Sequence, residues 1–158
     1  MCDHCGCRQG AIGRLMDQHD RISDLAGQVR QRLAAGEEPA ARATFATLRG
    51  VLDRHVTWEE RGLFARMTAQ GEFADHVADL EADHGWLNQA ISAADLSPTG
   101  WGGAVTGILD RLAEHIYRED YGLFPAAVSV LDAEDWAAID AVAPGSCGCG
   151  GCGEPAAA

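Results

Sequence analysis

The sequence predicts an all-α protein, an up-down-up-down four-helix bundle with a short C-terminal helix and cysteine-rich tails. Four long stretches repeat apolar residues at alternating steps of three and four, which is the spacing of one face of a helix. The breaks between them, at residues 36–39, 70–71 and 96–100, are short, so neighbouring helices are expected to run antiparallel. The sequence has no runs of alternating β-branched residues, and we expect no strand.

The four helices can be followed by the residues that face the expected core. On the first helix these are Ile12, Leu15, His19, Ile22, Ala26, Val29 and Leu33. The second helix has Pro39 in its first turn and continues through Phe45, Leu48, Leu52, His55, Glu59 and Gly62. The third presents Phe73, Val77, Leu80, His84, Leu87, Ile91 and Ala94, and the fourth Val105, Ile108, Leu112, His115, Glu119 and Gly122.

The end of the chain departs from this pattern. Pro125 is expected to kink or end the fourth helix before a short continuation over 128–131. A short fifth helix is predicted over 133–142, with Asp132 as its N-cap. The expected organisation is therefore a Cys-rich segment 1–10, a bundle 11–131, an extra helix 132–143 and a Gly/Cys-rich tail 144–158.

Six positions on the core-facing sides are polar, where a bundle normally has apolar residues: His19, His55, Glu59, His84, His115 and Glu119. Unpaired carboxylates would cost several kcal/mol each at such positions, and a bound metal removes that cost. A His and a Glu four residues apart project from one face of a helix and can chelate together, and this pair occurs twice. Residues beside the six, Asp20, Glu60, Asp83 and Asp120, either accept hydrogen bonds from imidazole N–H groups or lie in solvent.

The heights of these residues along the helices agree with a single site. His19 and His55 lie at equal distances from the first loop, at roughly 1.5 Å of rise per residue. His84 and His115 fall within about one turn of the same level. All four helices are therefore predicted to bring ligands to one layer of the core.

These residues resemble the hemerythrin-like, or HHE cation-binding, family. Each His-x3-Glu pair is followed by Gly-Leu-Phe, Phe124-Pro125 closes the second, and the resemblance covers about residues 11–131. It implies two iron ions in an oxo- and carboxylate-bridged centre, with Glu59 and Glu119 bridging and the four histidines as terminal ligands. The Cys-Gly-Cys start is similar to that of a small bacterial subgroup of this family.

The chain departs from the oxygen carriers of that family at two points. Leu80 stands where the carriers have a fifth histidine, which leaves about two coordination positions for other ligands. Glu81 or His76 would be an additional ligand, and Glu81 is better placed. The carriers take the last carboxylate one residue later, at Asp120, but the internal repeat favours Glu119.

The resemblance implies a non-haem di-iron protein that binds or reacts with O2, H2O2 or NO. Such redox activity toward a diatomic or peroxide ligand would need an electron donor. The alternative is a non-catalytic sensor of iron or oxygen, or an iron-handling module. Iron storage fits less well, because ferritin-like sites are richer in carboxylates.

The charge of the chain limits its partners. The 12 basic residues are all arginines, and with 24 acidic residues the net charge is −12. This acidity disfavours nucleic acid and anionic membranes. The sequence shows no run long enough for a membrane helix and no signal peptide, so a cytoplasmic location is expected.

All six cysteines lie near the ends of the chain. Their spacings are mirror images: Cys2, Cys5 and Cys7 at one end, Cys147, Cys149 and Cys152 at the other. The ends of a four-helix bundle lie together, so these thiols can meet and hold zinc, Cu(I) or an iron–sulfur cluster. They can also cycle between dithiol and disulfide as a source of electrons, or be ordinary thiols of flexible tails.

Overall fold

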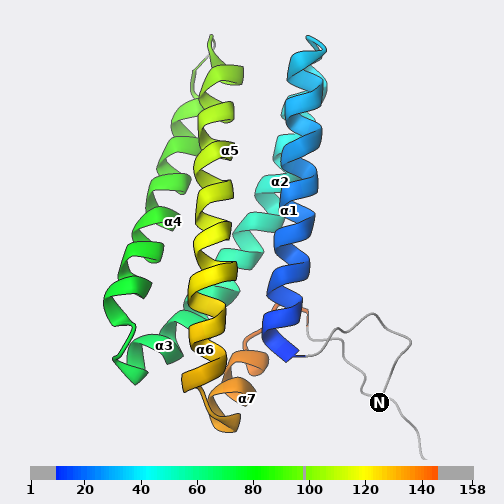
Figure 1. Ribbon diagram of the computed structural model, residues 1–158. Coiled ribbons are helices and arrows are strands. Elements are labelled where there is room, and N and C mark those ends of the chain that lie inside the picture. The colour runs from blue at the N-terminus through cyan, green and yellow to red at the C-terminus, as the bar shows by residue number, and fades with distance from the viewer. Residues whose placement is uncertain (1–9, 98, 146–158) are drawn as a thin grey trace, which may run out of the picture.

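The protein is described here by a computed structural model that covers residues 10–97 and 99–145, and all of its regular elements are helices (Figure 1). Four long helical segments form the bundle, and the all-α prediction is confirmed. They are α1 (Gly10–Ala34); α2 (Glu38–Glu59), η1 (Glu60–Phe64) and α3 (Ala65–Gln70); α4 (Ala74–Asp95); and α5 (Trp101–Arg118), η2 (Glu119–Leu123) and α6 (Phe124–Val130). A short helix, α7 (Ala133–Ala141), follows them.

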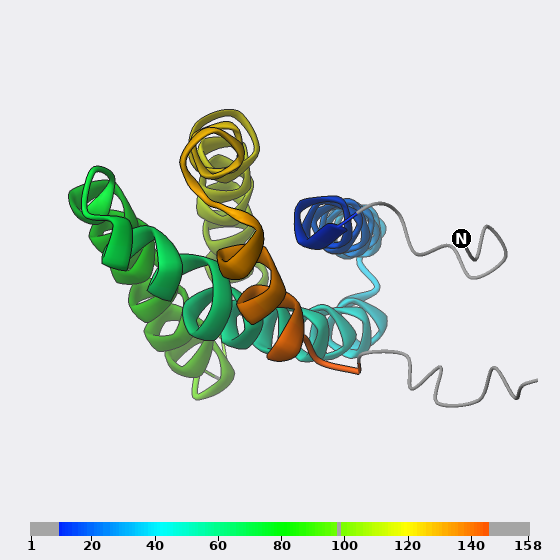
Figure 2. The same ribbon diagram turned by 90° about the horizontal axis from the view of Figure 1, so that it is seen from below.

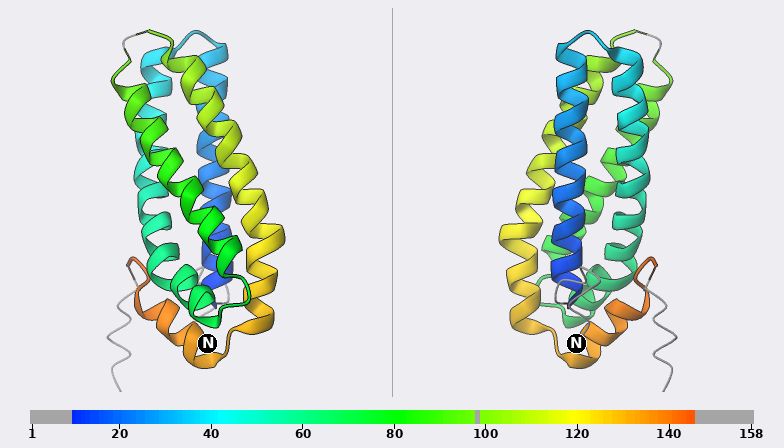
Figure 3. Two further views of the ribbon diagram at one scale, coloured as in Figure 1. Left: turned by 90° about the vertical axis from the view of Figure 1, so that its left-hand side faces the viewer. Right: turned by 90° about the vertical axis from the view of Figure 1, so that its right-hand side faces the viewer.

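The helices stand around the bundle axis in the order α1, α2, α4, α5 (Figure 2). α1 packs most extensively against α2, and α4 against α5. The turns around Gly36 and Gly100 lie at one end, and α7 crosses the other end near α3 (Figure 3). Both glycines have positive φ, 75° and 77°, a conformation that suits glycine at the limits of helices.

Two π-helical turns, η1 and η2, widen the second and fourth segments, and the sequence pattern did not predict them. The fourth helix does not end at Pro125, because α6 continues to Val130, close to the expected continuation over 128–131. In η2 the N–H of Phe124 donates to the carbonyl of Glu119, five residues back. Pro125 then lies where the α-helical register resumes, in the first turn of α6, so its missing N–H costs little there.

The predicted fifth helix is present as α7, and Asp132 caps it. The Asp132 side chain accepts hydrogen bonds from the backbone N–H groups of Glu134 and Asp135. The indole N–H of Trp58 donates to the carbonyl of Ile139 at 2.9 Å. A side chain at Gly62 would meet Ile139 at 3.2 Å, so the glycine allows α7 to pack on η1.

The apolar core is in two parts, separated by a polar layer. One part, toward the Gly36 end, contains residues such as Ile22, Leu48 and Leu109. The other, toward α7, contains residues such as Leu15 and Phe64. Among the described helices, none combines the length and apolarity needed to cross a membrane.

Candidate metal site

The structure brings the six polar seam residues together in the layer between the two parts of the core. His19 comes from α1, His55 and Glu59 from α2, His84 from α4, His115 from α5 and Glu119 from η2. Each is at most 5% exposed. The Nε2 atoms of His19 and His55 lie 3.0 Å apart, as do those of His84 and His115, so the predicted common height is correct.

The six residues form two groups that share both carboxylates. His19, His55, Glu59 and Glu119 make one group, and Glu59, His84, His115 and Glu119 make the other. Within each group one ligand atom per residue lies within 4.8 Å of the others. Each pair of histidines thus has its own space, and the two carboxylates lie between them.

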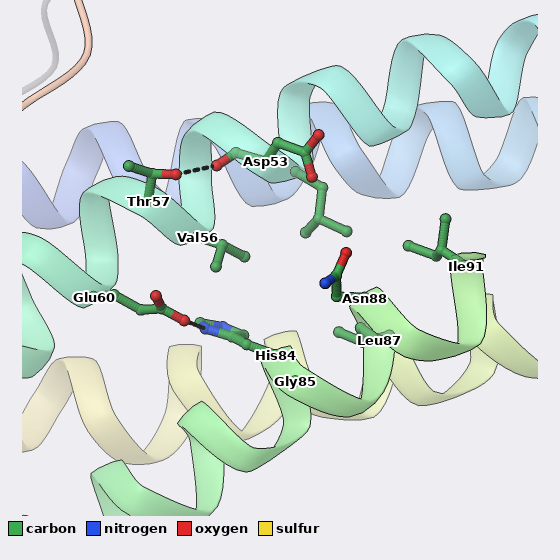
Figure 4. Close-up of a pocket in the computed structure, with 10 residues that line it drawn as sticks. Asp53, Val56, Thr57, Glu60, His84, Gly85, Leu87, Asn88 and Ile91 are labelled. Atoms are coloured by element: carbon green, nitrogen blue, oxygen red, sulfur yellow. Dashed lines mark hydrogen bonds and ion pairs between the residues drawn. The ribbon is translucent and has the colours of Figure 1, made fainter. Parts of the chain in front are cut away.

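Each imidazole is oriented by an oxygen on its Nδ1 side. Nδ1 of His19 contacts Asp120 at 2.7 Å and that of His55 contacts Gln18 Oε1 at 2.8 Å. Nδ1 of His84 contacts Glu60 at 3.0 Å (Figure 4).

The fourth imidazole follows the same rule at a longer distance. Nδ1 of His115 lies 3.5 Å from Asp83, a buried carboxylate that also accepts hydrogen bonds at 2.5 Å from Arg111 and Arg118. Because carboxylate and amide oxygens are acceptors, Nδ1 carries the proton in all four histidines. Every Nε2 is therefore the atom presented to the centre of the layer, as metal ligation requires.

Protons compensate the buried charge in the metal-free protein. Burial opposes protonation of His19, but the hydrogen bond to Asp120 and the carboxylate of Glu119 outweigh it and raise its pKa to about 9. Burial likewise opposes protonation of His115, yet Glu119 raises its pKa. Burial and the charge on His19 lower the pKa of His55 to about 3.

The two carboxylates differ in the same way. Burial and the charge of Glu119 raise the pKa of Glu59 well above its usual value. Burial would raise the pKa of Glu119 as well, but the neighbouring His115 and His19 outweigh burial and hold this pKa below its usual value. Glu119 thus raises the pKa of the two histidines beside it, His19 and His115, and the pKa values of the two carboxylates shift in opposite directions.

The carboxylate oxygens of the layer are free to act as metal ligands. All four oxygens of Glu59 and Glu119 are buried without a hydrogen-bond partner in the described part of the chain. Imidazole Nε2 atoms approach them, at 3.0 Å for His115 to Glu119 and 3.2 Å for His55 to Glu59, but not in hydrogen-bond geometry. Four imidazoles with two carboxylates are a donor set that suits iron or a similar first-row metal.

Other residues considered from the sequence lie elsewhere. Glu81 was expected as an additional ligand, but it is exposed and belongs to neither group. The reason is that the buried face of α4 runs through Leu80 and His84 and leaves Glu81 outside. His76 is also outside both groups. Asp20 is exposed.

One functional residue, Gln18, was missed. It precedes His19, but its amide oxygen serves the histidine of a different helix. The sequence shows that Gln18 and His19 are neighbours but not which residue lies opposite on α2. Glu60, Asp83 and Asp120 accept hydrogen bonds from imidazole Nδ1 atoms, which was the first of the two roles expected for them.

The two cysteine clusters, with Cys2, Cys5, Cys7, Cys147, Cys149 and Cys152, lie outside the described residues.

Comparison with protein families agrees with this arrangement. The model of the family described as the hemerythrin HHE cation binding domain matches residues 10–127, which include the six residues of the layer. Comparisons with curated proteins and with solved structures give no significant match.

Proposed function

Because the chain belongs to the hemerythrin HHE cation-binding family, we propose that it holds two iron ions in the His/Glu layer. The observation that carries the proposal is the division of six buried residues into two groups that share Glu59 and Glu119. Two histidines in each group and two shared carboxylates fit a pair of metal ions bridged by carboxylates. We assign His19 and His55 to one ion and His84 and His115 to the other.

The surrounding residues prepare this site for a small ligand. The two apolar parts of the core exclude bulk water from the layer on both sides. The hydrogen bonds at Nδ1 fix the tautomer and the orientation of each imidazole. Leu80 fills the buried position one turn before His84, so α4 supplies a single histidine to the His/Glu layer.

We infer that the function is the binding or reduction of a small molecule, namely O2, H2O2 or NO. Bound ferrous iron supplies the electrons for such a reaction. The chain contributes an enclosed layer whose six residues are buried, which favours small ligands over large substrates. Carboxylates beside the imidazoles balance the positive charge of the centre.

The proposal is tested by metal analysis of anaerobically purified protein, with absorption spectra before and after peroxide. About two irons per chain and a change in the visible spectrum are expected. Fewer than about one iron per chain, or an unchanged spectrum, would refute it. Steady-state consumption separates the two classes of function: a catalyst consumes many equivalents of peroxide or NO, and a sensor reacts once per site.

A further inference from the structure

A groove between α2 and α4 reaches one residue of the His/Glu layer (Figure 4). This α2–α4 groove has a volume of about 350 Å³. Its lining includes the polar residues Asp53, Glu60, His84 and Asn88 beside apolar residues such as Leu52 and Ile91. His84 belongs to the layer, so the groove connects the surface of the bundle to a proposed metal ligand.

The polar lining of this groove suits a cation. Asp53 and Glu60 contribute carboxylates and Asn88 an amide, and the lining contains no lysine or arginine. Glu60 is half exposed and accepts a hydrogen bond from Nδ1 of His84, so it joins the groove to the layer. Hard oxygen donors of this kind attract divalent ions, and negative clefts raise their local concentration.

Cations need such a route because the layer is enclosed. Its residues are at most 5% exposed, and apolar core lies on both sides of them along the bundle axis. A divalent ion that crossed either apolar part would lose its hydration without compensation. A side opening with carboxylates avoids this cost.

The opposite side of the bundle provides a contrast. A groove between α1 and α5, of about 200 Å³, is lined mainly by apolar residues such as Ile22, Leu109 and Leu112. It contains no residue of the layer, and its one charged residue is Arg30. This α1–α5 groove offers a cation no ligand.

We propose that divalent metal ions reach the His/Glu layer through the α2–α4 groove, guided by Asp53 and Glu60 to His84. The proposal rests on the proposed function, since it concerns the loading of the same site. It assigns to Asp53 and Glu60 a role in the rate at which metal binds.

Two matched glycines allow the route to be blocked without strain. Gly85 lines the α2–α4 groove and Gly27 the α1–α5 groove. Both lie within helices, and a Cβ added at either would meet no atom within 4 Å. Leucine is also the better helix former, so Gly85→Leu and Gly27→Leu are both expected to fold.

The rate of binding is measured by mixing the metal-free full-length chain with Co²⁺ and following the visible absorption of bound cobalt. Gly85→Leu is expected to slow binding by about tenfold or more while the final cobalt content stays unchanged. Gly27→Leu is expected to bind at the wild-type rate. Equal rates for the wild type and both variants would overturn the proposal.

A second pair of variants tests the charge alone. Asp53→Asn is expected to slow binding about threefold at low ionic strength and less at high salt. Asp24→Asn removes the same charge at an exposed position of α1 and is expected to have no effect. An Asp53→Asn rate equal to that of the wild type would show that this carboxylate does not guide the ion. If the wild type binds no metal, the proposed function is wrong. If the wild type binds metal but Gly85→Leu and Gly27→Leu bind it equally fast, only the proposed route is wrong.

Discussion

Replacement of Glu119 by Gln tests the shared carboxylate and the choice between Glu119 and Asp120. Glu119 lies 3.0 Å from Nε2 of His115 and 3.2 Å from Nε2 of His19, which belong to different groups. Glu119→Gln therefore removes an anionic ligand from both metal positions at once. Asp120 contacts Nδ1 of His19 alone, so Asp120→Asn should affect one position.

The magnitude follows from the linkage between metal binding and folding. Metal at a hundredfold excess over Kd stabilises the folded chain by about 2.7 kcal/mol per site, or about 5 kcal/mol for two sites. For a domain of this size that is a rise in Tm of roughly 15 °C. Loss of an outer hydrogen bond weakens metal binding by about 10- to 100-fold, or about 1.4 to 2.7 kcal/mol.

The assay is thermal unfolding with and without metal, combined with metal content per chain. Glu119→Gln should lose both metals and almost all of the metal-dependent rise in Tm. Asp120→Asn should keep the metal at the His84/His115 position, bind the other more weakly, and lose roughly a quarter to a half of the rise. Asp20→Asn, an exposed change beside His19, is the control and should behave as wild type. A Glu119→Gln protein that retains two metals and the full rise would refute the reasoning.

Three further predictions concern protons and packing. The pKa of His19 is raised to about 9 and that of His115 is also raised, so metal binding must displace protons from these histidines. The affinity for metal should therefore increase from about pH 6.5 to 8.5. Calorimetry in buffers of different ionisation enthalpy should detect the released protons. Ile139→Ala empties a fully buried position of α7 and should lower the free energy of unfolding of the metal-free chain by about 2 to 4 kcal/mol in urea; a loss below the error of the measurement would show that α7 contributes little. Asp83→Asn leaves Arg111 and Arg118 with a neutral partner and should lower the midpoint of urea unfolding by less than Ile139→Ala does, because both arginine side chains reach solvent; an unchanged midpoint would contradict a structural role for this ion pair.

The helical fold and the six polar positions could both be predicted from the apolar repeat, because the repeat identifies the core-facing side of each helix and the polar residues that interrupt it. An apolar repeat at steps of three and four places a face of each helix, and loop positions fix heights along the axis to within a turn. His55 and Glu59 stand out only because they interrupt that face. The family match over residues 10–127 agrees with this reasoning.

Rotation about a helix axis and local changes of helical register could not be predicted in the same way. Glu81 is one turn from His84, yet it is exposed, because His84 lies at the edge of the core face of α4: the buried Leu80 and Leu87 lie on one side of it around the helix and Glu81 on the other. Gln18 acts on a neighbouring helix, which depends on how α1 and α2 are rotated against each other. The π-helical turns begin at the end of the two His-x3-Glu pairs, and the Leu and Phe after each pair are buried while Gly122 is exposed; a uniform 3.6-residue repeat does not reveal such a change of register.

The division of the core by the His/Glu layer has a consequence for how the chain opens and closes. Without metal, the layer adds charge compensation but little apolar burial, so each half of the bundle depends on its own apolar contacts. Amide hydrogen exchange of the metal-free chain should then resolve two cooperative units, one toward the Gly36 turn and one toward α7. Metal ligands from all four long helical segments cross-link the units at mid-height, so that exchange at the most protected amides of both halves requires the same global unfolding event.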